Sequence, residues 1–415
     1  MKRRQFLAAA AAAALPVGAR AAGSARVVVV GGGFAGASCA RALKKANAGI
    51  DVTLVESAGV FTACPRSNGV IVGLRELASQ QFKYDALERA GIRLVHADAT
   101  AVDTAARTVI VKDARLPYDR LVIAPGIAMR WNALRGYDQA AAERMPHAWQ
   151  AGDQTLLLRK QLQAMPDGGL VVIAVPAYPY RCPTAPYERA SLIAHYLKAR
   201  KPRSKLLILD SKDGFTQQRL FEEAWQALYP GVIEWVALSQ GGGVASVDAA
   251  SGTLETDFDK HHPAVANVIP PQKAGTIAEA AGVADATGWC PIDAASFESK
   301  LQPRIHVIGD AAIAGALPKS GFAASSAGKA CALAVAALLA ERQPAAPALF
   351  NACYSELAPD YGISLSSRLH VAGGQIVEIP GSFRASEAEA PRAERAREAA
   401  RGEASFREVT GEMFG

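Results

Sequence analysis

Two regions of the chain alternate short apolar runs with helix-forming segments. In the first, apolar runs at 26–30 and 52–55 flank a helical segment at 36–45. In the second, runs at 170–175 and 206–209 flank a helical segment at about 187–198. Short apolar runs separated by helices are typical of parallel sheets that are covered by helices. The pattern predicts an α/β protein with two Rossmann-like dinucleotide-binding domains.

Two further apolar runs extend the first domain. The run at 118–126 (YDRLVIAPG) leads into a Pro-Gly turn, and the run at 305–310 (IHVIGD) precedes a small-residue helix at 320–339. We therefore expect the first domain to be interrupted, with its last strand and helix far downstream. The expected division is a first domain at 23–140 and 273–345, a central domain at 141–272, and a smaller C-terminal domain and partner interface at 346–415.

The turn after the first apolar run has the pattern G-x-G-x-x-G, from Gly31 to Gly36, and Glu56 ends the next run. Gly31 permits the tight turn, Gly33 lets a pyrophosphate approach the backbone, and Gly36 lets helix and strand pack closely. The helix N-terminus then offers N–H groups to the phosphates, and Glu56 can accept hydrogen bonds from a ribose. The pattern in this context predicts a bound dinucleotide. The alternative is a tight turn without a ligand.

The downstream runs favour FAD over NAD as this dinucleotide. The run at 118–126 closes the first domain, and Asp310, at the end of 305–310, is placed to bind the ribityl chain. The alternative for Asp310 is a helix cap or a strand-end turn. The cofactor-binding residues predicted on these grounds are Gly31, Gly33, Phe34, Ala35, Gly36, Glu56, Ala124, Gly126 and Asp310.

The turn of the second region differs from the first. Residues 176–183 (PAYPYRCP) contain no glycine and carry bulky side chains where a pyrophosphate needs close backbone approach. We therefore expect the central domain to keep the dinucleotide-binding fold without a nicotinamide site. Electrons must then reach the flavin from a substrate that acts at the flavin or at a nearby cysteine.

The first 22 residues have the features of a targeting peptide. Arg3 and Arg4 precede Phe6 and an apolar stretch, and a small-x-small site ends at Ala21. This predicts a twin-arginine signal, cleavage near Ala21 and a periplasmic protein. The alternatives are a signal anchor or a Sec signal. Four of the 45 basic residues fall in this segment, so the rest of the chain is nearly neutral against 39 acidic residues and the composition gives no indication of nucleic-acid binding.

The six cysteines form no C-x-x-C pair and no C-x-x-C-H motif. The chain therefore predicts no zinc or iron–sulfur site and no covalent haem of its own, and the histidines show no metal-ligand spacing. After the first 22 residues no stretch reaches the roughly 18 apolar residues of a membrane span. The tail at 385–404 is rich in Ala, Glu and Arg and is expected to be a solvated helix or a disordered linker.

Several motifs together resemble the flavoprotein subunit of flavocytochrome c sulfide dehydrogenase, a relative of sulfide:quinone oxidoreductase. The motifs, which span nearly the whole chain after residue 22, are VVVVGGGFAGA (27–37), ACPRSN (63–68), PHAWQAGDQT (146–155), YRCPTAPYERAS (180–191), GWCPID (288–293), HVIGDAAIAGALPKSGF (306–322) and CYSELAPDYGIS (353–364). The resemblance implies a glutathione reductase-like fold, with two dinucleotide-binding domains and a smaller C-terminal domain.

The resemblance also implies roles for three cysteines. Cys64 matches the position where the family attaches FAD through an 8α-S-cysteinyl thioether, and the alternative is a buried, unmodified cysteine. Cys182 and Cys353 match a redox-active disulfide that sulfide attacks, with Cys353 expected to face the flavin. The alternative for that pair is a plain stabilising disulfide. Cys39, Cys331 and Cys290 are expected to have no redox role.

Two charged residues complete the predicted site. Lys319 precedes the helix at 320–339, where its charge and the helix dipole would stabilise reduced flavin, or it is an exposed loop lysine. Glu188 is either a proton carrier at the sulfide site or a first-turn helix charge. The function implied is oxidation of sulfide to sulfur or polysulfide, with electrons passed to a c-type cytochrome subunit that carries the haem. The alternatives are a periplasmic sulfide:quinone oxidoreductase and a non-catalytic flavoprotein partner of a sulfur-oxidising complex.

Overall fold

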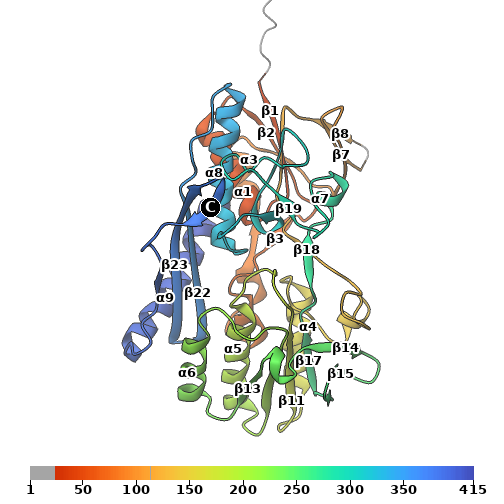
Figure 1. The fold of residues 1–415 in the computed structure, drawn as a ribbon, viewed down its shortest axis with the longest axis vertical. Helices are drawn as coiled ribbons and strands as arrows, with labels where there is room; N and C mark the ends of the chain where they lie inside the picture. Colours follow the sequence, from red (N-terminus) through yellow and green to blue (C-terminus); the bar gives the residue numbers. More distant parts are fainter. Residues whose placement is uncertain (1–23, 113) are drawn as a thin grey trace, which may run out of the picture.

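Two parallel sheets and one antiparallel sheet form the framework of the protein in the computed structural model, which describes residues 24–112 and 114–415 (Figure 1). The predicted signal segment and its cleavage site lie outside the described residues. The α/β class is confirmed. The first sheet occupies the upper part of Figure 1, the second the lower part, and the third runs along one side of both.

The first sheet has the strand order β20-β9-β1-β2-β5, and all of its neighbouring strands are parallel. Its strands are β1 (Arg26–Val30), β2 (Asp51–Val55), β5 (Arg93–Val95), β9 (Arg120–Ile123) and β20 (Ile305–Val307). β20 pairs with β9 although the whole second sheet lies between them in the chain. This pairing places the downstream motif around Asp310 beside the glycine turn that follows β1.

Two helices with small residues pack against each other, and the first of them packs against the first sheet. They are α1 (Phe34–Ala46) and α8 (Gly321–Leu339). A Cβ atom at Gly328 of α8 would lie 2.2 Å from the carbonyl oxygen of Ala35 in α1, so the two backbones are in direct contact. The Ser38 and Ser325 hydroxyls bond across the same contact at 2.8 Å. The small residues of α8 therefore serve close helix packing beside the glycine turn.

Smaller elements complete this half of the molecule. They are β3 (Val60–Thr62), α2 (Ser67–Ile71), β4 (Gln81–Lys83), α3 (Asp85–Arg89), β6 (Ala99–Asp103), β7 (Thr108–Val111), β8 (Ala114–Pro117), β10 (Ile127–Met129), β18 (Gln272–Ala274), α7 (Ile277–Ala280), β19 (Cys290–Pro291) and β21 (Ala312–Ile313). β10 pairs antiparallel with β18, so the two chain crossings between the upper and lower halves lie side by side.

The second sheet has the strand order β13-β12-β11-β17 and is also parallel. Its elements are α4 (Asp153–Ala164), β11 (Leu170–Val175), α5 (Ala185–Arg200), β12 (Lys205–Asp210), α6 (Gln218–Leu228), β13 (Ile233–Val236), β14 (Val244–Asp248), β15 (Thr253–Thr256), β16 (Lys260–His261) and β17 (Val265–Val268). The strands β11 and β12 match the predicted apolar runs. Both are buried because helices cover the sheet.

The C-terminal region is an antiparallel sheet followed by a long helix. Its elements are β22 (Leu349–Ala358), β23 (Tyr361–Ala372), β24 (Gln375–Glu378), β25 (Arg384–Ala385) and α9 (Arg392–Phe414). The tail is therefore neither a linker nor a fully solvated helix, because α9 buries one face. Arg395 and Glu398 form a buried ion pair at 2.9 Å on that face. The charged sequence did not predict this burial, because these charged side chains pair with each other inside the fold.

By length and composition α8 is the one helix of residues 24–112 and 114–415 that is apolar enough to cross a membrane. This 19-residue helix matches the small-residue helix predicted at 320–339, but it corrects the expectation that no stretch after residue 22 reaches the length and apolar character of a membrane span. Half of its apolar stretch is buried inside the protein, against α1 and β22.

Candidate active site

The glycine turn after β1 leaves open space at the start of α1. Gly31 has a φ of +100°, and a Cβ there would lie 2.2 Å from the carbonyl oxygen of Ala124. A Cβ at Gly36 would lie 1.8 Å from the carbonyl oxygen of Gly31. Gly33 is different, because the nearest atom to a Cβ at that position would be a Phe61 ring carbon at 3.4 Å. Gly31 and Gly36 are required by the turn itself, and Gly33 borders space that a phosphate can enter.

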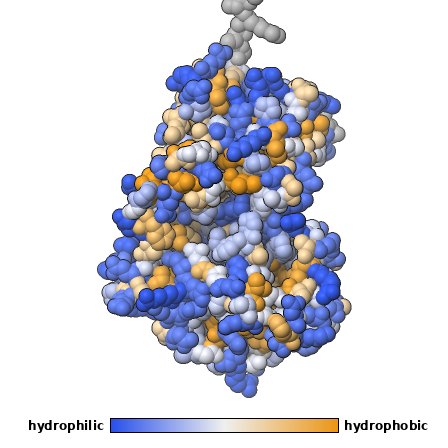
Figure 2. All heavy atoms as spheres, in the orientation of Figure 1, coloured by the Kyte–Doolittle hydropathy of each residue, from blue (hydrophilic) through white to orange (hydrophobic). Residues whose placement is uncertain are grey.

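A cavity of about 480 Å³ opens from this turn. Most of the predicted cofactor residues line it, together with one of the two predicted redox cysteines. These are Gly31, Gly33, Phe34, Ala35, Glu56, Cys64, Ala124, Gly126, Asp310 and Cys182. Gly36 lies behind the turn, where it packs helix on strand. Figure 2 shows a recess between the upper and lower halves of the molecule, with hydrophobic side chains gathered above it.

Glu56 is fixed by the backbone of the turn. Its two carboxylate oxygens accept hydrogen bonds from the N–H groups of Gly32 at 2.7 Å and Ala58 at 2.9 Å. Each carboxylate oxygen has a second lone pair that remains free to accept a hydroxyl. Glu56 is therefore held in place at the cavity wall, as binding of a ribose requires.

Asp310 lines the cavity, and one of its carboxylate oxygens is buried without a hydrogen-bond partner. Its Oδ1 is buried and makes no hydrogen bond, while its Oδ2 lies 3.9 Å from Nη1 of Arg181. Burial raises the pKa of Asp310, and Arg181 and Lys319 oppose that rise. A buried unpaired acceptor is costly unless a ligand satisfies it. The hydroxyl-rich ribityl chain of FAD fits this acceptor, so the residues present suit the cofactor.

Lys319 does not line the cavity, in contrast to the expectation that its charge faces the flavin. Its ammonium donates to the carbonyl oxygens of Asp310 at 2.6 Å and Ala312 at 2.9 Å, and it lies 3.9 Å from the Trp289 ring centroid. Burial lowers the pKa of Lys319 to about 8. The lysine thus ties the strand end to the start of α8, whose first residues Ser320 and Gly321 do line the cavity.

Cys182 and Cys353 come together from distant parts of the sequence. Cys182 lies in the turn after β11 with a φ of 59°, and its N–H donates to the Lys319 carbonyl at 2.7 Å. Cys353 lies in β22, and its sulfur is 3.3 Å from the Thr184 hydroxyl. Burial and the neighbouring Cys353 raise the pKa of the Cys182 thiol, and burial raises that of Cys353 to about 11. The two are unbonded in the structure.

Cys182 lines the cavity, and Cys353 is not among the lining residues. The expectation that Cys353 faces the flavin stays a prediction. Sequence separation could not reveal the position of Cys182, because the φ of Cys182 sets the direction of its side chain. The remaining cysteines, Cys39, Cys290 and Cys331, are buried away from the cavity. Within the described residues, no group of histidine, cysteine and acidic side chains is arranged to hold a metal ion.

Glu188 is a buried carboxyl group in the cavity wall. Burial raises its pKa from 4.5 to about 7, Arg66 opposes the rise, and Glu356 adds to it. Arg66 lies 3.1 Å from Glu356 and 3.1 Å from Glu403 of α9, so a charged network leads from this wall to the molecular surface. A carboxyl group that titrates near neutral pH beside two thiols can accept and return protons. Glu188 also lies in the first turn of α5, as the alternative of a helix charge predicts, and its side chain is buried there.

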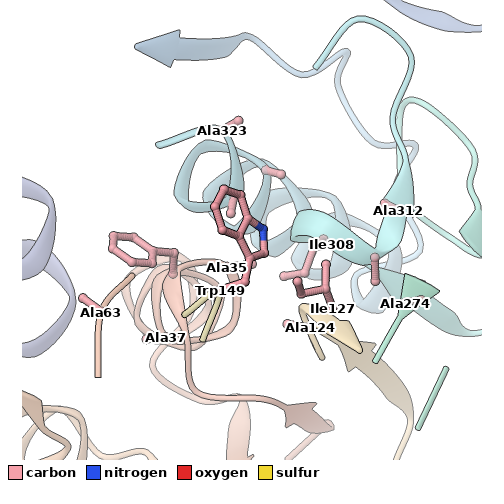
Figure 3. Close-up of a cluster of buried hydrophobic side chains, with 14 of the residues drawn as sticks. Ala35, Ala37, Ala63, Ala124, Ile127, Trp149, Ala274, Ile308, Ala312 and Ala323 are labelled. Carbon is pink, nitrogen blue, oxygen red and sulfur yellow. The ribbon is translucent and has the colours of Figure 1, made fainter. Parts of the chain in front are cut away.

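Cys64 lies in the connection between β3 and α2, in the wall of the cavity. Its sulfur approaches the carbonyl oxygen of Trp149 at 3.9 Å, and Nη2 of Arg181 donates to the same oxygen. Figure 3 shows the Trp149 side chain among small side chains such as Ala35 and Ala323. Sequence reasoning did not single out Trp149 or Arg181. Their place within the quoted motifs PHAWQAGDQT and YRCPTAPYERAS was the only available signal.

Side chains of the central unit surround the acid at the end of β12. Asp210, at the end of β12, accepts from the Tyr187 hydroxyl at 2.6 Å and from Trp235 Nε1 at 3.0 Å, and pairs with Lys212 at 2.5 Å. The Phe215 ring stacks on Tyr187 at a centroid distance of 3.5 Å. The acid that corresponds to Glu56 is therefore fully occupied within the protein.

Comparisons with known proteins agree with this architecture. Three family profiles match the chain: "Pyridine nucleotide-disulphide oxidoreductase" at 25–173, "Sulfide dehydrogenase [flavocytochrome c] flavoprotein chain, central" at 155–270, and "Flavocytochrome c sulphide dehydrogenase, flavin-binding" at 345–414. The sulfide dehydrogenase [flavocytochrome c] flavoprotein chain of Chlorobaculum thiosulfatiphilum is 58% identical over 48 residues, which cover all of that sequence and 12% of this chain.

Solved structures share the fold. The sulfide:quinone oxidoreductase of Aquifex aeolicus superposes with a TM-score of 0.72 at 17% identity, over 94% of this chain and 92% of that one. Putidaredoxin reductase, in its covalent complex with putidaredoxin, gives a TM-score of 0.66 at 17% identity, over 94% and 93%. These confirm the predicted fold of a flavoprotein with two dinucleotide-binding domains. Together with the family profiles and the Chlorobaculum relative, they establish that the chain belongs to the family of flavocytochrome c sulfide dehydrogenase flavoprotein chains.

Proposed function

We propose that this protein is an exported, FAD-dependent sulfide dehydrogenase that passes electrons to a c-type cytochrome subunit. The observation that carries the proposal is the position of Cys182. This cysteine comes from the second dinucleotide-binding unit, yet it lines the cavity of the first beside Cys353. A reactive sulfur pair at the wall of a flavin cavity suits two-electron oxidation of a sulfur substrate.

Cys182 and Cys353 act in their oxidised, disulfide-bonded form. Hydrosulfide attacks one of the two sulfurs, so that the S–S bond between the cysteines breaks and a new S–S bond joins the substrate to the protein. The other cysteine leaves as a thiolate. When this thiolate re-forms the bond with the other cysteine, the substrate sulfur leaves as sulfur or as part of a polysulfide, and a proton and two electrons are released. FAD would accept these two electrons and would release them one at a time to the cytochrome. Each sulfide is thereby oxidised to the level of sulfur or polysulfide.

Glu188 accepts and returns the protons of this cycle. Its pKa of about 7 leaves it partly ionised at neutral pH, which is the condition for efficient general acid–base catalysis. Thr184 holds the Cys353 sulfur at 3.3 Å and stabilises its thiolate by hydrogen bonding. These residues therefore serve the sulfur chemistry, and the glycine turn, Glu56 and Asp310 serve cofactor binding.

The central unit does not bind a nicotinamide cofactor in this proposal. Supporting this, Asp210 is occupied by Tyr187, Trp235 and Lys212, and a Tyr178–Tyr180 ring stack stands in the turn at a centroid distance of 5.1 Å. Sulfide should bleach the flavin absorbance within milliseconds to seconds, whereas NADH should leave it unchanged. If NADH reduced the flavin as fast as sulfide does, that result would contradict this part of the proposal.

The choice of electron acceptor and the attachment of FAD are tested separately. The purified protein should reduce cytochrome c faster than a soluble quinone analogue under sulfide, and the opposite order would favour a sulfide:quinone oxidoreductase. After acid precipitation, flavin should stay on a peptide that contains Cys64, as the 8α-S-cysteinyl thioether requires. Release of all flavin into the supernatant would contradict the covalent link. Recovery of protein that lacks residues up to Ala21 from the periplasm tests export.

A further inference from the structure

Three arginine side chains line the cofactor cavity, and the protein itself occupies two of them. The three are Arg66, Arg181 and Arg189. Arg66 lies 3.1 Å from each of two carboxylates, those of Glu356 and Glu403. Arg189 is buried and donates to four oxygen atoms of the protein, at distances from 2.6 to 3.0 Å. Neither of these two arginines has donors to spare for a ligand.

Arg181 keeps most of its donors free. Within residues 24–112 and 114–415 its side chain makes one hydrogen bond, from Nη2 to the carbonyl oxygen of Trp149. One carboxylate oxygen, Oδ2 of Asp310, lies at the long distance of 3.9 Å from Nη1. The side chain is 19% exposed and lines the cavity, so its remaining N–H groups can reach a ligand there. Because arginine stays protonated in proteins, the cavity wall carries a cation with unused donors.

The neighbours of Arg181 locate this cation along the cavity. Nη1 lies beside Asp310, which is assigned to the ribityl chain. Nη2 donates to the Trp149 carbonyl oxygen, which the Cys64 sulfur also approaches, at 3.9 Å. Cys64 is the residue assigned to the flavin ring, so the guanidinium lies between the part of the cavity for the ribityl chain and the part for the ring. The Arg181 backbone is held there, because its N–H donates to Oε1 of Gln272 at 2.9 Å.

We propose that Arg181 sets the redox potential of the flavin, by stabilising the negative charge that the flavin ring gains on reduction. The sequence assigned this task to Lys319, but the Lys319 ammonium donates to the carbonyl oxygens of Asp310 and Ala312 and does not line the cavity. The second dinucleotide-binding unit thus supplies the cation as well as Cys182. This inference rests on the binding of FAD in the proposed function, and it does not require that sulfide is the electron donor.

The charge balance of flavin reduction gives the sign of the effect. The oxidised ring is neutral, and uptake of two electrons and one proton leaves it with one negative charge. A fixed cation nearby favours the charged form of a group over its neutral form. Arg181 therefore stabilises the reduced flavin more than the oxidised flavin, which raises the potential.

The test compares the flavin midpoint potentials of full-length wild type, Arg181→Gln and Arg181→Lys, each loaded with FAD. Flavin absorbance is recorded against the applied potential. Arg181→Gln should lower the ratio of reduced to oxidised flavin at a given potential by at least about tenfold, which for two electrons is a fall of about 30 mV. Arg181→Lys keeps the charge and should keep most of the wild-type potential. A variant that binds both redox states equally weakly shows no shift, so the potential separates electrostatics from a structural defect.

Arg120→Gln is the matched control. The Arg120 side chain is 13% exposed, but it pairs with Glu298 at 3.1 Å and does not line the cavity. This variant should have the wild-type potential. Arg181→Met keeps the apolar stem of the side chain without its charge, and it should show the same fall as Arg181→Gln if that variant folds poorly.

The outcomes separate this inference from the proposed function. An unchanged potential in the neutral Arg181 variants, or a potential of Arg181→Lys as low as that of Arg181→Gln, overturns the inference alone. A lowered potential in a protein whose flavin sulfide does not reduce supports the inference and overturns the proposed sulfide oxidation. Wild type that binds no FAD overturns both.

Discussion

The turn after β1 and the turn after β11 connect equivalent strands and helices, but they treat the space beyond the strand in opposite ways. The first turn is built on Gly31 and Gly36, whose missing side chains let the backbone close tightly and leave a cavity. The second turn carries Tyr178 and Tyr180, whose rings stack on each other with the Lys212 ammonium 5.2 and 5.0 Å from their centroids. One fold thus provides an open turn and a filled one.

The acidic residues at the ends of β2 and β12 differ in the same way as the two turns. Glu56 is held by two backbone N–H groups of its own turn and faces the cavity. Asp210 is fully buried and bonded to three side chains of its own unit. These contacts give Asp210 a structural role in its own unit. The fold alone does not assign a dinucleotide, and the side chains at the turn do.

The filled turn gains a different task in the proposed function. A backbone that no longer wraps a phosphate can place Cys182 at a φ of 59°, so that its side chain enters the cavity of the neighbouring unit. The second turn then supplies the sulfur that reacts at the cofactor of the first. Variants in each of the two turns test how far their functions differ.

The largest effect is expected for Cys182→Ser. Removing one sulfur of the reactive pair should lower the rate of flavin reduction by sulfide by roughly a thousandfold or more, the scale observed when a catalytic nucleophile is deleted. Stopped-flow absorbance of the flavin measures this rate. FAD binding should be unchanged, because the first turn is intact. Cys331→Ala, which alters a buried cysteine of α8 outside the cavity, should reduce at the wild-type rate. Rapid reduction of Cys182→Ser would assign the second turn a purely structural role.

Glu188→Gln should lower the same rate by about a hundredfold, the lower end for loss of an acid–base group. The pKa of Glu188 is raised from 4.5 to about 7 by burial, so the wild-type rate should increase with pH through about 7 as the carboxyl ionises. Sulfide itself ionises in a similar pH range, so the rate of Glu188→Gln should keep only the pH dependence that comes from the substrate. Its pH profile should therefore be flatter, and an unchanged profile would exclude Glu188 as the base.

Stability gives an independent measure of the same carboxyl group. Its pKa is higher in the folded state than in the unfolded state, so its contribution is fully present below about 4.5 and is lost as the pH rises through about 7. Glu188→Gln should therefore show a smaller loss of unfolding free energy between these pH values than wild type, measured by urea denaturation. An equal loss of unfolding free energy in both proteins would mean that a group other than Glu188 titrates in this pH range.

Gly31→Ala tests the open turn. The φ of +100° and the contact of 2.2 Å that a Cβ would make with Ala124 should cost about 1–3 kcal/mol, which weakens FAD binding by at least about tenfold. Fluorescence titration of the flavin-free protein measures the affinity. Gly59→Ala is the control, since no atom lies within 4 Å of its added Cβ. Equal affinities in both variants would show that the turn tolerates a side chain.

Sequence patterns predicted the parts of this molecule that depend on local chemistry. The apolar runs located β1, β2, β11 and β12, and the glycine spacing located the cavity, because both follow from backbone geometry within a few residues. The absence of glycine at 176–183 predicted a changed second turn. The structure adds that Tyr187 and Lys212 bind the carboxylate of Asp210.

Contacts between distant segments could not be predicted in the same way. The meeting of Cys64 with Arg181 at the Trp149 carbonyl depends on three segments, and nothing in any one of them indicates the others. Lys319 was expected at the cofactor because it precedes α8, but its side chain turns to Trp289 instead. The α9 tail was misjudged because charge predicts exposure only when the charges are unpaired.

Phe414→Ala is expected to have the smallest effect, and to act on the open turn alone. The Phe414 ring packs at the end of α9 against Phe61 and Tyr84, at centroid distances of 5.4 and 5.7 Å. Phe61 lines the cavity, and the Tyr84 hydroxyl would lie 2.6 Å from a Cβ on Gly32, so the C-terminus supports the first turn from outside. Losing the ring should cost about 2 kcal/mol, below the range for a central core phenylalanine, and lower the melting temperature by about 4 °C.

Thermal unfolding followed by flavin fluorescence and by the exposure of Trp235 reports on the two units separately. Arg401→Ala, on the exposed face of α9, is the control. A fall in the flavin signal before the Trp235 signal would confirm that Phe414 stabilises the open turn, whereas simultaneous loss would mean that the two turns unfold as one unit.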